Sequence, residues 1–196
     1  EDGAMAIAID SEDDVVVTGK VWNGANHDLR TIKYAGADGG QLWEAKYNGP
    51  GSSEDVPTGV CVDFQNDVIV IGKVWNDFNH DWLIEKYGVA NGSLVWSVKR
   101  NGPEDSNDVP TAVATDSTGN VVVTGKMWNG ANHDIRTEKY TANGTFLWDA
   151  KANGPGTSYD GATDVGIDGV GDVVITASIW NDYNFDIYCA KYAAGG

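Results

Sequence analysis

The stretch KVWNGANHD at residues 20–28 decides the fold, because the chain repeats it three more times. It returns as KVWNDFNHD at 73–81, as KMWNGANHD at 126–134 and, more divergently, as SIWNDYNFD at 178–186. The tryptophans of the four copies lie 53, 53 and 52 residues apart. A repeat of this length typically corresponds to one supersecondary unit that packs against its neighbours. The chain therefore consists of three complete units and part of a fourth.

Each unit contains segments that alternate with a period of two, as β-strands do, and none with the helical period of 3.6. In the first unit they are AMAIAI at 4–9, VVVTGKVW at 15–22, LRTIKY at 29–34 and QLWEAKY at 41–47. Turn sequences such as ADGG and ANGS separate them, and a longer segment of the type NGPGSSED follows the fourth strand. We therefore expect each unit to be a four-stranded antiparallel meander followed by a crossover.

Four-stranded units at this period predict an all-β fold, a β-propeller of four-stranded blades. We expect a single domain over 1–196 with four blades at about 2–54, 55–107, 108–159 and 160–196, the last blade lacking its outer strand. Units 1 and 3 share WNGANHD, whereas units 2 and 4 share WND, an aromatic residue and Asn, as duplication of a two-blade block would leave them. This alternation favours a closed ring of four blades; a piece of a larger ring is the alternative.

Composition limits the classes of partner. The 29 acidic and 13 basic residues give a net charge of −16, which argues against nucleic acid as a partner, because phosphates need clustered Lys and Arg. No run of 18 apolar residues occurs, so we expect no membrane insertion. Cys61 and Cys189 fall on different units, and we expect them to be too far apart to form a disulfide.

The stretch DLRTIKYAGADGGQLWEAKYNGPGSSEDVPTGVCVDFQNDVIVIGKV at 28–74 resembles the bacterial SBBP repeat, which is named for the seven-bladed β-propeller. That repeat reads D-x-x-x-x-K-Y, a glycine turn, L-W, R-Y-N-G, D-x-A, A-V-D, G-N and V-x-V-T-G, and the likeness extends over essentially the whole chain. It implies a secreted or cell-surface protein of a prokaryote, in which the repeats serve as scaffold or binding modules, alone or within a larger surface assembly. The family supplies no catalytic residues, and this chain has too few units for seven blades.

The repeated phrase supplies the candidate ligand-binding residues. We expect the turn between the second and third strands to share one face with the crossovers, so that the phrase and the nearby aspartates edge an acidic face. The candidates are Trp22, Asn23, His27, Asp28, Trp75, Asn76, His80, Asp81, Trp128, Asn129, His133, Asp134, Trp180, Asn181 and Asp186. The structural alternative is that each His bonds the neighbouring crossover and each Asp accepts backbone N–H groups to fix a turn.

Calcium is the candidate metal, because it takes six to eight oxygen ligands, and repeated aspartates beside glycine-rich crossovers could supply them. The candidate ligands are Asp55, Asp108 and Asp160. No EF-hand spacing is present, and the three histidines stand on different blades, too far apart to share one ion. No cofactor is otherwise indicated.

The tryptophans fall into two registers. We expect Trp22, Trp75, Trp128 and Trp180 to pack between blades, and Trp43, Trp96 and Trp148, on the outer strands, to lie in the core. Trp82 stands where the other units have Leu or Ile and is also expected in the core.

Three functions are compatible with these features. The first is a non-catalytic extracellular scaffold that contacts a protein or a surface through the acidic face. The second is a lectin-like module with one shallow sugar site per blade, built from the Trp, Asn and Asp of the phrase. The third is a hydrolase that uses carboxylates at the central opening. No nucleophile elbow, P-loop or HExxH motif occurs, so the first function is favoured.

Overall fold

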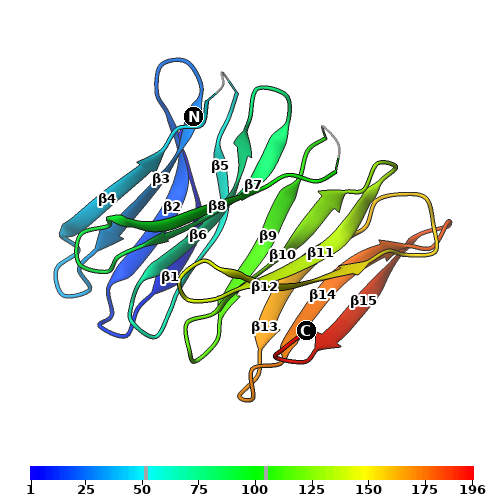
Figure 1. Ribbon diagram of the computed structural model, residues 1–196. Coiled ribbons are helices and arrows are strands. Elements are labelled where there is room, and N and C mark those ends of the chain that lie inside the picture. Colours follow the sequence, from blue (N-terminus) through cyan, green and yellow to red (C-terminus); the bar gives the residue numbers. More distant parts are fainter. Residues whose placement is uncertain (51–52, 104–105) are drawn as a thin grey trace.

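The computed structural model describes residues 1–50, 53–103 and 106–196, and every regular element in these ranges is a β-strand (Figure 1). Blade 1 consists of β1 (Gly3–Ile9), β2 (Val15–Trp22), β3 (His27–Tyr34) and β4 (Gln41–Tyr47). Blade 2 consists of β5 (Val56–Val62), β6 (Val68–Trp75), β7 (His80–Tyr87) and β8 (Leu94–Arg100). Blade 3 consists of β9 (Val109–Thr115), β10 (Val121–Trp128), β11 (His133–Tyr140) and β12 (Phe146–Ala152). Blade 4 consists of β13 (Gly161–Ile167), β14 (Val173–Trp180) and β15 (Phe185–Tyr192).

Within each blade the strands are antiparallel and lie in chain order. The predicted meander and the missing outer strand of the last blade are therefore confirmed, as is the β-propeller fold class. Residues 51–52 and 104–105, in the expected crossovers after β4 and β8, lie outside the described residues.

An aspartate builds the tight turn between the first two strands of each blade. In blade 2, Asp63 Oδ1 accepts hydrogen bonds from the backbone N–H groups of Gln65 and Asp67, at 2.9 and 3.1 Å. Its other oxygen, Oδ2, lies 2.7 Å from Lys86 Nζ on β7. The equivalent pairs are Lys33 with Asp10, Lys139 with Asp116 and Lys191 with Asp168. One aspartate therefore ties the first three strands of a blade together at one edge.

The hydrophobic core lies between the blades, in three clusters that correspond to the three junctions. The first joins blades 1 and 2 and includes Val16, Leu29, Trp43, Val70 and Leu83. The second joins blades 2 and 3 and includes Ile71, Trp82, Ile84, Val123 and Tyr140. The third joins blades 3 and 4 and includes Val122, Ile135, Val173 and Ile175. Because burial of one such side chain contributes about 1.5–3 kcal/mol, packing between successive blades dominates the stability.

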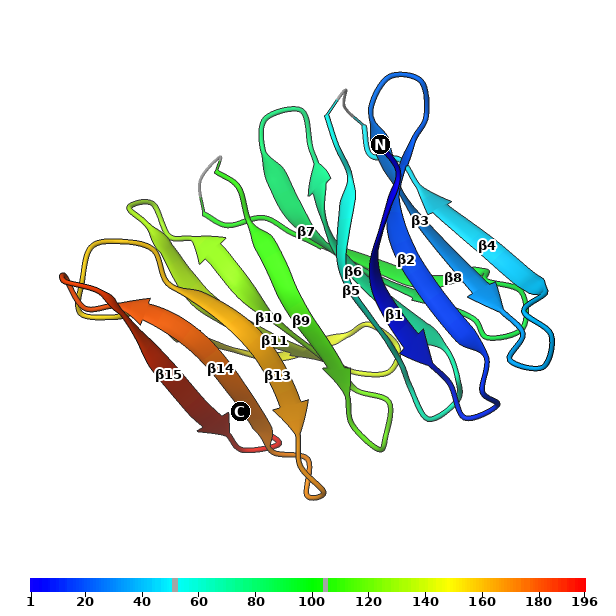
Figure 2. The same ribbon diagram turned by 180° about the vertical axis from the view of Figure 1, so that it is seen from behind.

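The four blades form an open arc rather than a closed ring. Strand contacts run from β1 to β5, from β5 to β9 and from β9 to β13, whereas the described residues include no comparable contact between blades 1 and 4. Figures 1 and 2 show these two blades at opposite ends of the molecule. The expectation of a four-bladed closed ring is therefore wrong. The rotation between blades depends on the volume of the side chains packed between them, which the repeat length does not determine.

Candidate binding site at the blade corners

The turn between the second and third strands, here called the corner, is held by an asparagine. In blade 1, Asn23 Oδ1 accepts hydrogen bonds from the backbone N–H groups of Ala25 and Asn26, at 2.8 and 3.1 Å. Its amide nitrogen donates to the side-chain oxygens of Asn26 and Asp28, at 2.6 and 2.7 Å. Asn76, Asn129 and Asn181 accept the corresponding backbone bonds in their own blades. The side chain of the repeated Asn thus makes its hydrogen bonds within the corner itself.

The aspartate that begins each third strand differs among the blades. Asp28, Asp81 and Asp186 each accept a hydrogen bond from the corner asparagine side chain, at 2.7, 3.0 and 2.7 Å. The partner in these bonds is therefore a side-chain amide instead of the backbone N–H that the pattern suggests. In blade 3, Asp134 Oδ1 is buried and has no hydrogen-bond partner among the described residues. Blade 3 thus presents a carboxylate oxygen that the fold leaves unused.

The histidines fasten each corner to the crossovers on either side of its blade. His27 Nδ1 lies 2.8 Å from Glu54 Oε1 in the following crossover, and its Nε2 lies 3.1 Å from the carbonyl oxygen of Glu1. His80 makes the equivalent contacts with Asn107 and with the carbonyl of Glu54, and His133 Nε2 contacts the carbonyl of Asn107. These contacts are the ones that a structural corner requires. The described residues contain no group of three or more His, Cys, Asp or Glu side chains able to hold a metal.

The corner tryptophans pack on the corners and lie outside the core clusters between blades. The rings of Trp22 and His27 meet edge to face with centroids 5.2 Å apart, and Trp75 and Trp128 pack on His80 and His133 in the same way. In blade 4, Phe185 replaces the histidine and packs on Trp180 at 5.1 Å. Trp22 is 52% exposed, so its expected position between blades is wrong. Trp75, Trp128 and Trp180 are partly buried, and an added Cβ at Gly156, in the crossover after blade 3, would lie 2.6 Å from Trp180.

The other tryptophans lie between blades, as expected. Trp82 is fully buried, and Trp43 is 5% exposed. Trp96 and Trp148 are partly buried and pack against the second and third core clusters. Each of the three outer-strand indoles donates a hydrogen bond to a backbone carbonyl of the next blade, namely those of Val89, Ala142 and Ala194.

The candidate calcium ligands already have partners for both carboxylate oxygens. Asp108 accepts hydrogen bonds from the backbone N–H groups of Trp128 and Gly102, at 2.7 and 2.5 Å. Asp55 and Asp160 accept the equivalent bonds. All three are buried, and burial raises the pKa of Asp108 to about 6 against these N–H bonds. A carboxylate that binds N–H donors with both oxygens does not suit a cation, so these residues do not fit calcium.

A pocket of about 110 Å³ opens beside the corner of blade 3. It lies at the junction of two blades, since Pro103 belongs to the crossover after blade 2 and Met127 packs in the core cluster that blades 2 and 3 share. Trp128, Asn129 and Asp134 of the repeated phrase line it. Ile135, Arg136 and Lys151 complete the wall. The pocket therefore combines an indole, an amide, a carboxylate and two cations.

Blade 1 carries the same pocket with the same volume, about 110 Å³. Its lining residues are the equivalents of those in blade 3, namely Val21, Trp22, Asn23, Asp28, Leu29, Arg30 and Lys46. In blade 2, Trp82 replaces the aliphatic residue and Leu83 replaces the arginine. In blade 4, Tyr188 replaces the arginine, and no outer strand supplies the lysine. The cationic pocket thus follows the alternation of the repeated phrase between odd and even blades.

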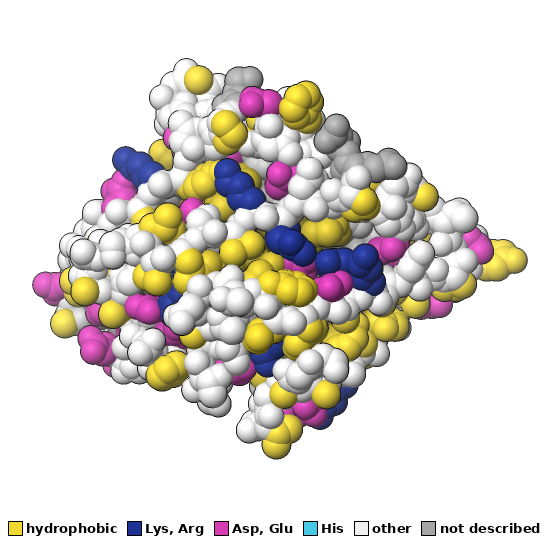
Figure 3. All heavy atoms as spheres, viewed as in Figure 1, with side chains coloured by type: hydrophobic (Ala, Val, Ile, Leu, Met, Phe, Trp, Pro, Cys, Tyr) yellow, Lys and Arg dark blue, Asp and Glu magenta, His cyan; other side chains and the backbone are white. Residues whose placement is uncertain are grey.

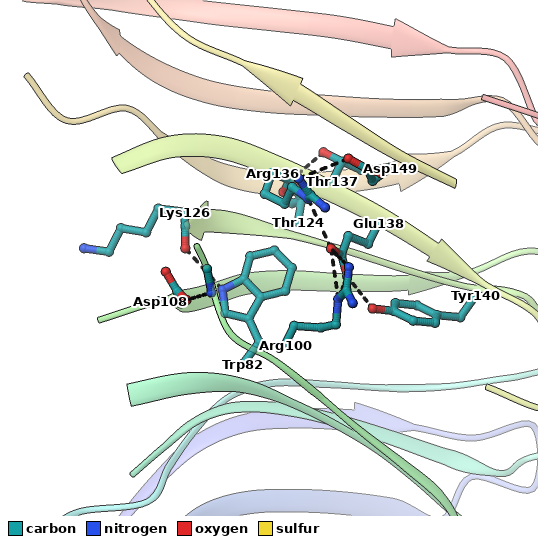
Figure 4. A network of polar contacts seen from close by, with 11 residues as sticks. Trp82, Arg100, Asp108, Thr124, Lys126, Arg136, Thr137, Glu138, Tyr140 and Asp149 are labelled. Atoms are coloured by element: carbon teal, nitrogen blue, oxygen red, sulfur yellow. Dashed lines mark hydrogen bonds and ion pairs between the residues drawn. The ribbon is translucent and has the colours of Figure 1, made fainter. Parts of the chain in front are cut away.

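A polar network fixes the arginine of the blade 3 pocket, as Figure 4 shows. Arg136 Nε lies 3.1 Å from Glu138 Oε1, and Arg136 Nη1 lies 3.1 Å from Asp149 Oδ2. Glu138 is fully buried and also binds Arg100 of blade 2, at 3.0 Å. Figure 3 shows Lys and Arg side chains gathered near the middle of this side of the molecule, among hydrophobic side chains. Two carboxylates of its own blade thereby hold the guanidinium of Arg136, and Arg100 joins Glu138 to blade 2 across the junction.

The arginine and the lysine of these pockets are not among the site residues predicted from the sequence. The available signal is the tetrapeptide that ends the phrase, HDLR at 27–30 and HDIR at 133–136, against HDWL at 80–83 and FDIY at 185–188. The acidic face is also weaker than expected, because Asp55, Asp81, Asp108 and Asp160 are buried. The corner face is therefore defined by its pockets more than by its carboxylates.

No protein-family model matches the chain, and no curated protein matches it in sequence. Among solved structures, a quinohemoprotein alcohol dehydrogenase from Pseudomonas putida HK5 is similar at a TM-score of 0.52 and 16% identity, over 90% of this chain and 30% of that one. The polysaccharide lyase Uly1 has a TM-score of 0.49 and 10% identity, over 94% of this chain and 48% of that one. An endo-arabinase from Bacteroides thetaiotaomicron has a TM-score of 0.49 and 9% identity, over 95% and 72%.

These structural neighbours are β-propeller proteins, and the likeness to the dehydrogenase shows the fold alone. The chain spans about half the length of the lyase and less than a third of the dehydrogenase. No helix among the described residues is long and apolar enough to cross a membrane.

Proposed function

We propose that the chain is a non-catalytic binding module that holds a neutral sugar in the corner pockets of blades 1 and 3. The observation that supports this proposal is the recurrence of one pocket, built from equivalent residues of the same types, in two blades of one rigid scaffold.

The chemistry of the blade 3 pocket suits a hydroxylated ligand. Sugar hydroxyls donate and accept hydrogen bonds, and the lining of the pocket includes the carboxylate of Asp134 as an acceptor and the ammonium group of Lys151 as a donor. Trp128 supplies an apolar wall on which the CH groups of a sugar ring can pack.

Each corner pocket is small for a ligand site. Small-molecule sites usually enclose about 300–1,000 Å³, whereas each corner pocket encloses about 110 Å³, so it has room for only part of a sugar ring. The four inner strands β1, β5, β9 and β13 carry a single carboxylate, Asp164, so they offer no carboxylate pair for hydrolysis. Two weak sites on one scaffold suit a ligand with repeated units, because binding at one site raises the local concentration at the other.

The location outside the cell and the membership of a surface assembly rest on the resemblance to the SBBP repeat, and both stay predictions. A protein partner is the competing ligand class, and the experiment separates the two.

The experiment is a glycan array followed by calorimetry with the sugar that binds. We expect Asp134→Asn and the double variant Lys46→Met, Lys151→Met to weaken binding by about tenfold or more, equal to ~1.4 kcal/mol. The matched control is Lys99→Met, because Lys99 holds the same position on blade 2, where its partner on the neighbouring strand is Leu83 in place of an arginine. Binding of no neutral sugar, or equal losses in the control and the pocket variants, would contradict the proposal.

A further inference from the structure

The two ends of the arc expose surfaces that the three internal junctions bury. The forward face of a blade is the face turned toward the next blade, and the rear face is the face turned toward the preceding one. On the forward face, Leu29, Trp82 and Ile135 occupy equivalent positions in blades 1 to 3 and are fully buried. Their equivalent in blade 4, Ile187, is 93% exposed. An isoleucine built for a junction therefore lacks its partner surface.

The receiving side of this contact is a small residue in the next blade. An added Cβ at Gly72 would lie 3.2 Å from Leu29, and one at Gly125 would lie 3.0 Å from Trp82, so each forward side chain rests on the glycine of the following blade. The equivalent residue of blade 1 is Gly19. It lines an open hollow of about 280 Å³ on the rear face, together with the apolar Val17, Val21 and Ile32 and the charged Asp2, Lys20 and Arg30. Blade 1 thus has the hollow that Ile187 would fill.

The inner strand of blade 1 shows the same relationship. Val60 and Val62 on β5 pack against the core cluster shared with blade 1. Their equivalents on β1 are Ile7 and Ile9, and Ile7 is 66% exposed. Two larger apolar side chains therefore stand uncovered where blade 2 buries two valines.

Polar groups at the two ends are complementary as well. Lys86 Nζ and Lys139 Nζ each reach a backbone carbonyl of the following blade, at Ala142 and Ala194. The side chains of these lysines are only 3% exposed, whereas the side chain of Lys191 in blade 4 is 54% exposed. The carbonyl equivalent to that of Ala142 belongs to Gly36 in blade 1. Lys191 therefore has a counterpart at the far end of the chain.

We infer that this chain binds a second copy of itself head to tail, with the forward face of blade 4 in one copy packed on the rear face of blade 1 in the other. The occupant is a second copy because the two end faces carry the equivalents of residues that already pack together at all three internal junctions. A head-to-tail contact made twice closes a ring of two copies, which here contains eight blades. Eight is within the usual range of four to eight blades for propellers. The inference does not depend on the sugar pockets.

The contact between copies is weaker than an internal junction. Blade 4 lacks the outer strand that would supply a tryptophan equivalent to Trp43, Trp96 and Trp148. Those indoles pack on Gly92, Gly144 and Gly196, whereas an added Cβ at the equivalent Gly39 of blade 1 would meet nothing within 4 Å. Only the three inner strands of blade 4 contribute to the contact, so we expect the two copies to separate on dilution.

The test is sedimentation equilibrium over a range of concentrations. We expect the unmodified chain to form a species of two copies, and Ile187→Asp and Ile7→Asp each to remain monomeric at the same concentrations. Both side chains are exposed in the single chain, so neither variant should unfold it. The matched control is Tyr183→Ser at the tip of a corner, which is 90% exposed and lies away from both end faces, and it should associate normally.

A mixture of the two aspartate variants distinguishes head-to-tail from other contacts. Ile187→Asp keeps the rear face of blade 1 intact, and Ile7→Asp keeps the forward face of blade 4 intact. The mixture should therefore form a pair of unlike copies that neither variant forms alone. The rate of alkylation of the Cys189 thiol gives a second measurement of association. The residues at the same position in blades 1 to 3, Thr31, Ile84 and Thr137, are fully buried. The thiol should react more slowly as the chain associates. A chain that remains monomeric, that associates equally as Ile187→Asp, or that grows beyond two copies would overturn the inference.

Discussion

The carboxylate of Asp108 accepts a hydrogen bond at 2.7 Å from the backbone N–H of Trp128, twenty residues further along the chain. The same carboxylate accepts a second bond, at 2.5 Å, from the backbone N–H of Gly102 in the crossover. One buried side chain thereby joins the start of an inner strand, the end of the second strand and the crossover. Asp55 and Asp160 repeat this arrangement in blades 2 and 4.

The first prediction concerns the pH dependence of stability. Burial raises the pKa of Asp108 from 3.8 to about 6 in the folded chain. Between these values the folded state binds more protons than the unfolded state, so the free energy of unfolding falls as pH rises through the window. Titration of this group lowers the free energy of unfolding by about 3 kcal/mol in total, and the loss is complete above pH 6. Urea denaturation of the native chain and of Asp108→Asn at a series of pH values measures it.

The variant lacks this titration, so the difference in unfolding free energy between the two proteins should change by about 3 kcal/mol across the window. The control is Asp2→Asn, because Asp2 binds the N–H of Trp22 at the equivalent position but is exposed. Parallel pH profiles for the native chain and Asp108→Asn would contradict the prediction.

The second prediction compares a buried and an exposed copy of one ion pair. The side chains of Lys86 and Asp63 are 3% and 0% exposed, whereas those of Lys191 and Asp168 are 54% and 35% exposed. Lys86→Met leaves a buried carboxylate without its cation and should lower the free energy of unfolding by about 3–5 kcal/mol. Lys191→Met should have a much smaller effect on the free energy of unfolding, because solvent screens that pair.

Urea denaturation at low protein concentration, where the chain is a monomer, measures both variants. Equal losses of stability at the two sites would show that burial by the next blade does not distinguish them.

The third prediction isolates the contact between an outer-strand tryptophan and the next blade. Gly92 and Gly39 both have positive φ values, 66° and 73°, so replacement by Ala imposes the same backbone strain at both. An added Cβ at Gly92 would lie 2.6 Å from Trp43, whereas at Gly39 it meets nothing within 4 Å. Gly92→Ala should therefore destabilise the chain by about 1–3 kcal/mol more than Gly39→Ala.

Thermal denaturation followed by tryptophan fluorescence measures this difference. A shift in emission for Gly92→Ala alone would report the displacement of Trp43, and identical midpoints for the two variants would argue against a tight contact.

The sequence predicts those features that depend on local chemistry. Strand alternation and the spacing of the tryptophans each require particular residues at particular positions, so they are visible in one unit and recur in the next. Trp82 is recognisable as a core residue because it replaces the aliphatic residues Leu29, Ile135 and Ile187 of the equivalent strands. The tie between His27 and the crossover was likewise visible, since the histidine recurs wherever a crossover follows.

The features that the sequence does not predict depend on how the blades meet. Closure of the ring depends on the angle between blades, and therefore on whether Leu29 or Trp82 fills a junction, not on the length of the repeat. The corner pocket depends on Arg136 and Lys151, which are far apart in the chain and meet on paired strands. Trp22 was misplaced because an apolar pattern identifies a buried strand but does not show where the neighbouring blade ends.

The fourth prediction concerns metal. Both carboxylate oxygens of Asp55, Asp108 and Asp160 accept backbone N–H bonds, so a cation would have to displace donors that the fold already orders. EDTA should therefore leave the thermal midpoint unchanged, and added Ca²⁺ should raise it no more than Mg²⁺ does at equal ionic strength. Asp108→Ala supplies the matched comparison, because loss of the carboxylate should lower the midpoint equally with and without Ca²⁺. A midpoint that falls in EDTA and is restored by Ca²⁺ alone, in the native chain but not in Asp108→Ala, would instead place a calcium ion at these carboxylates.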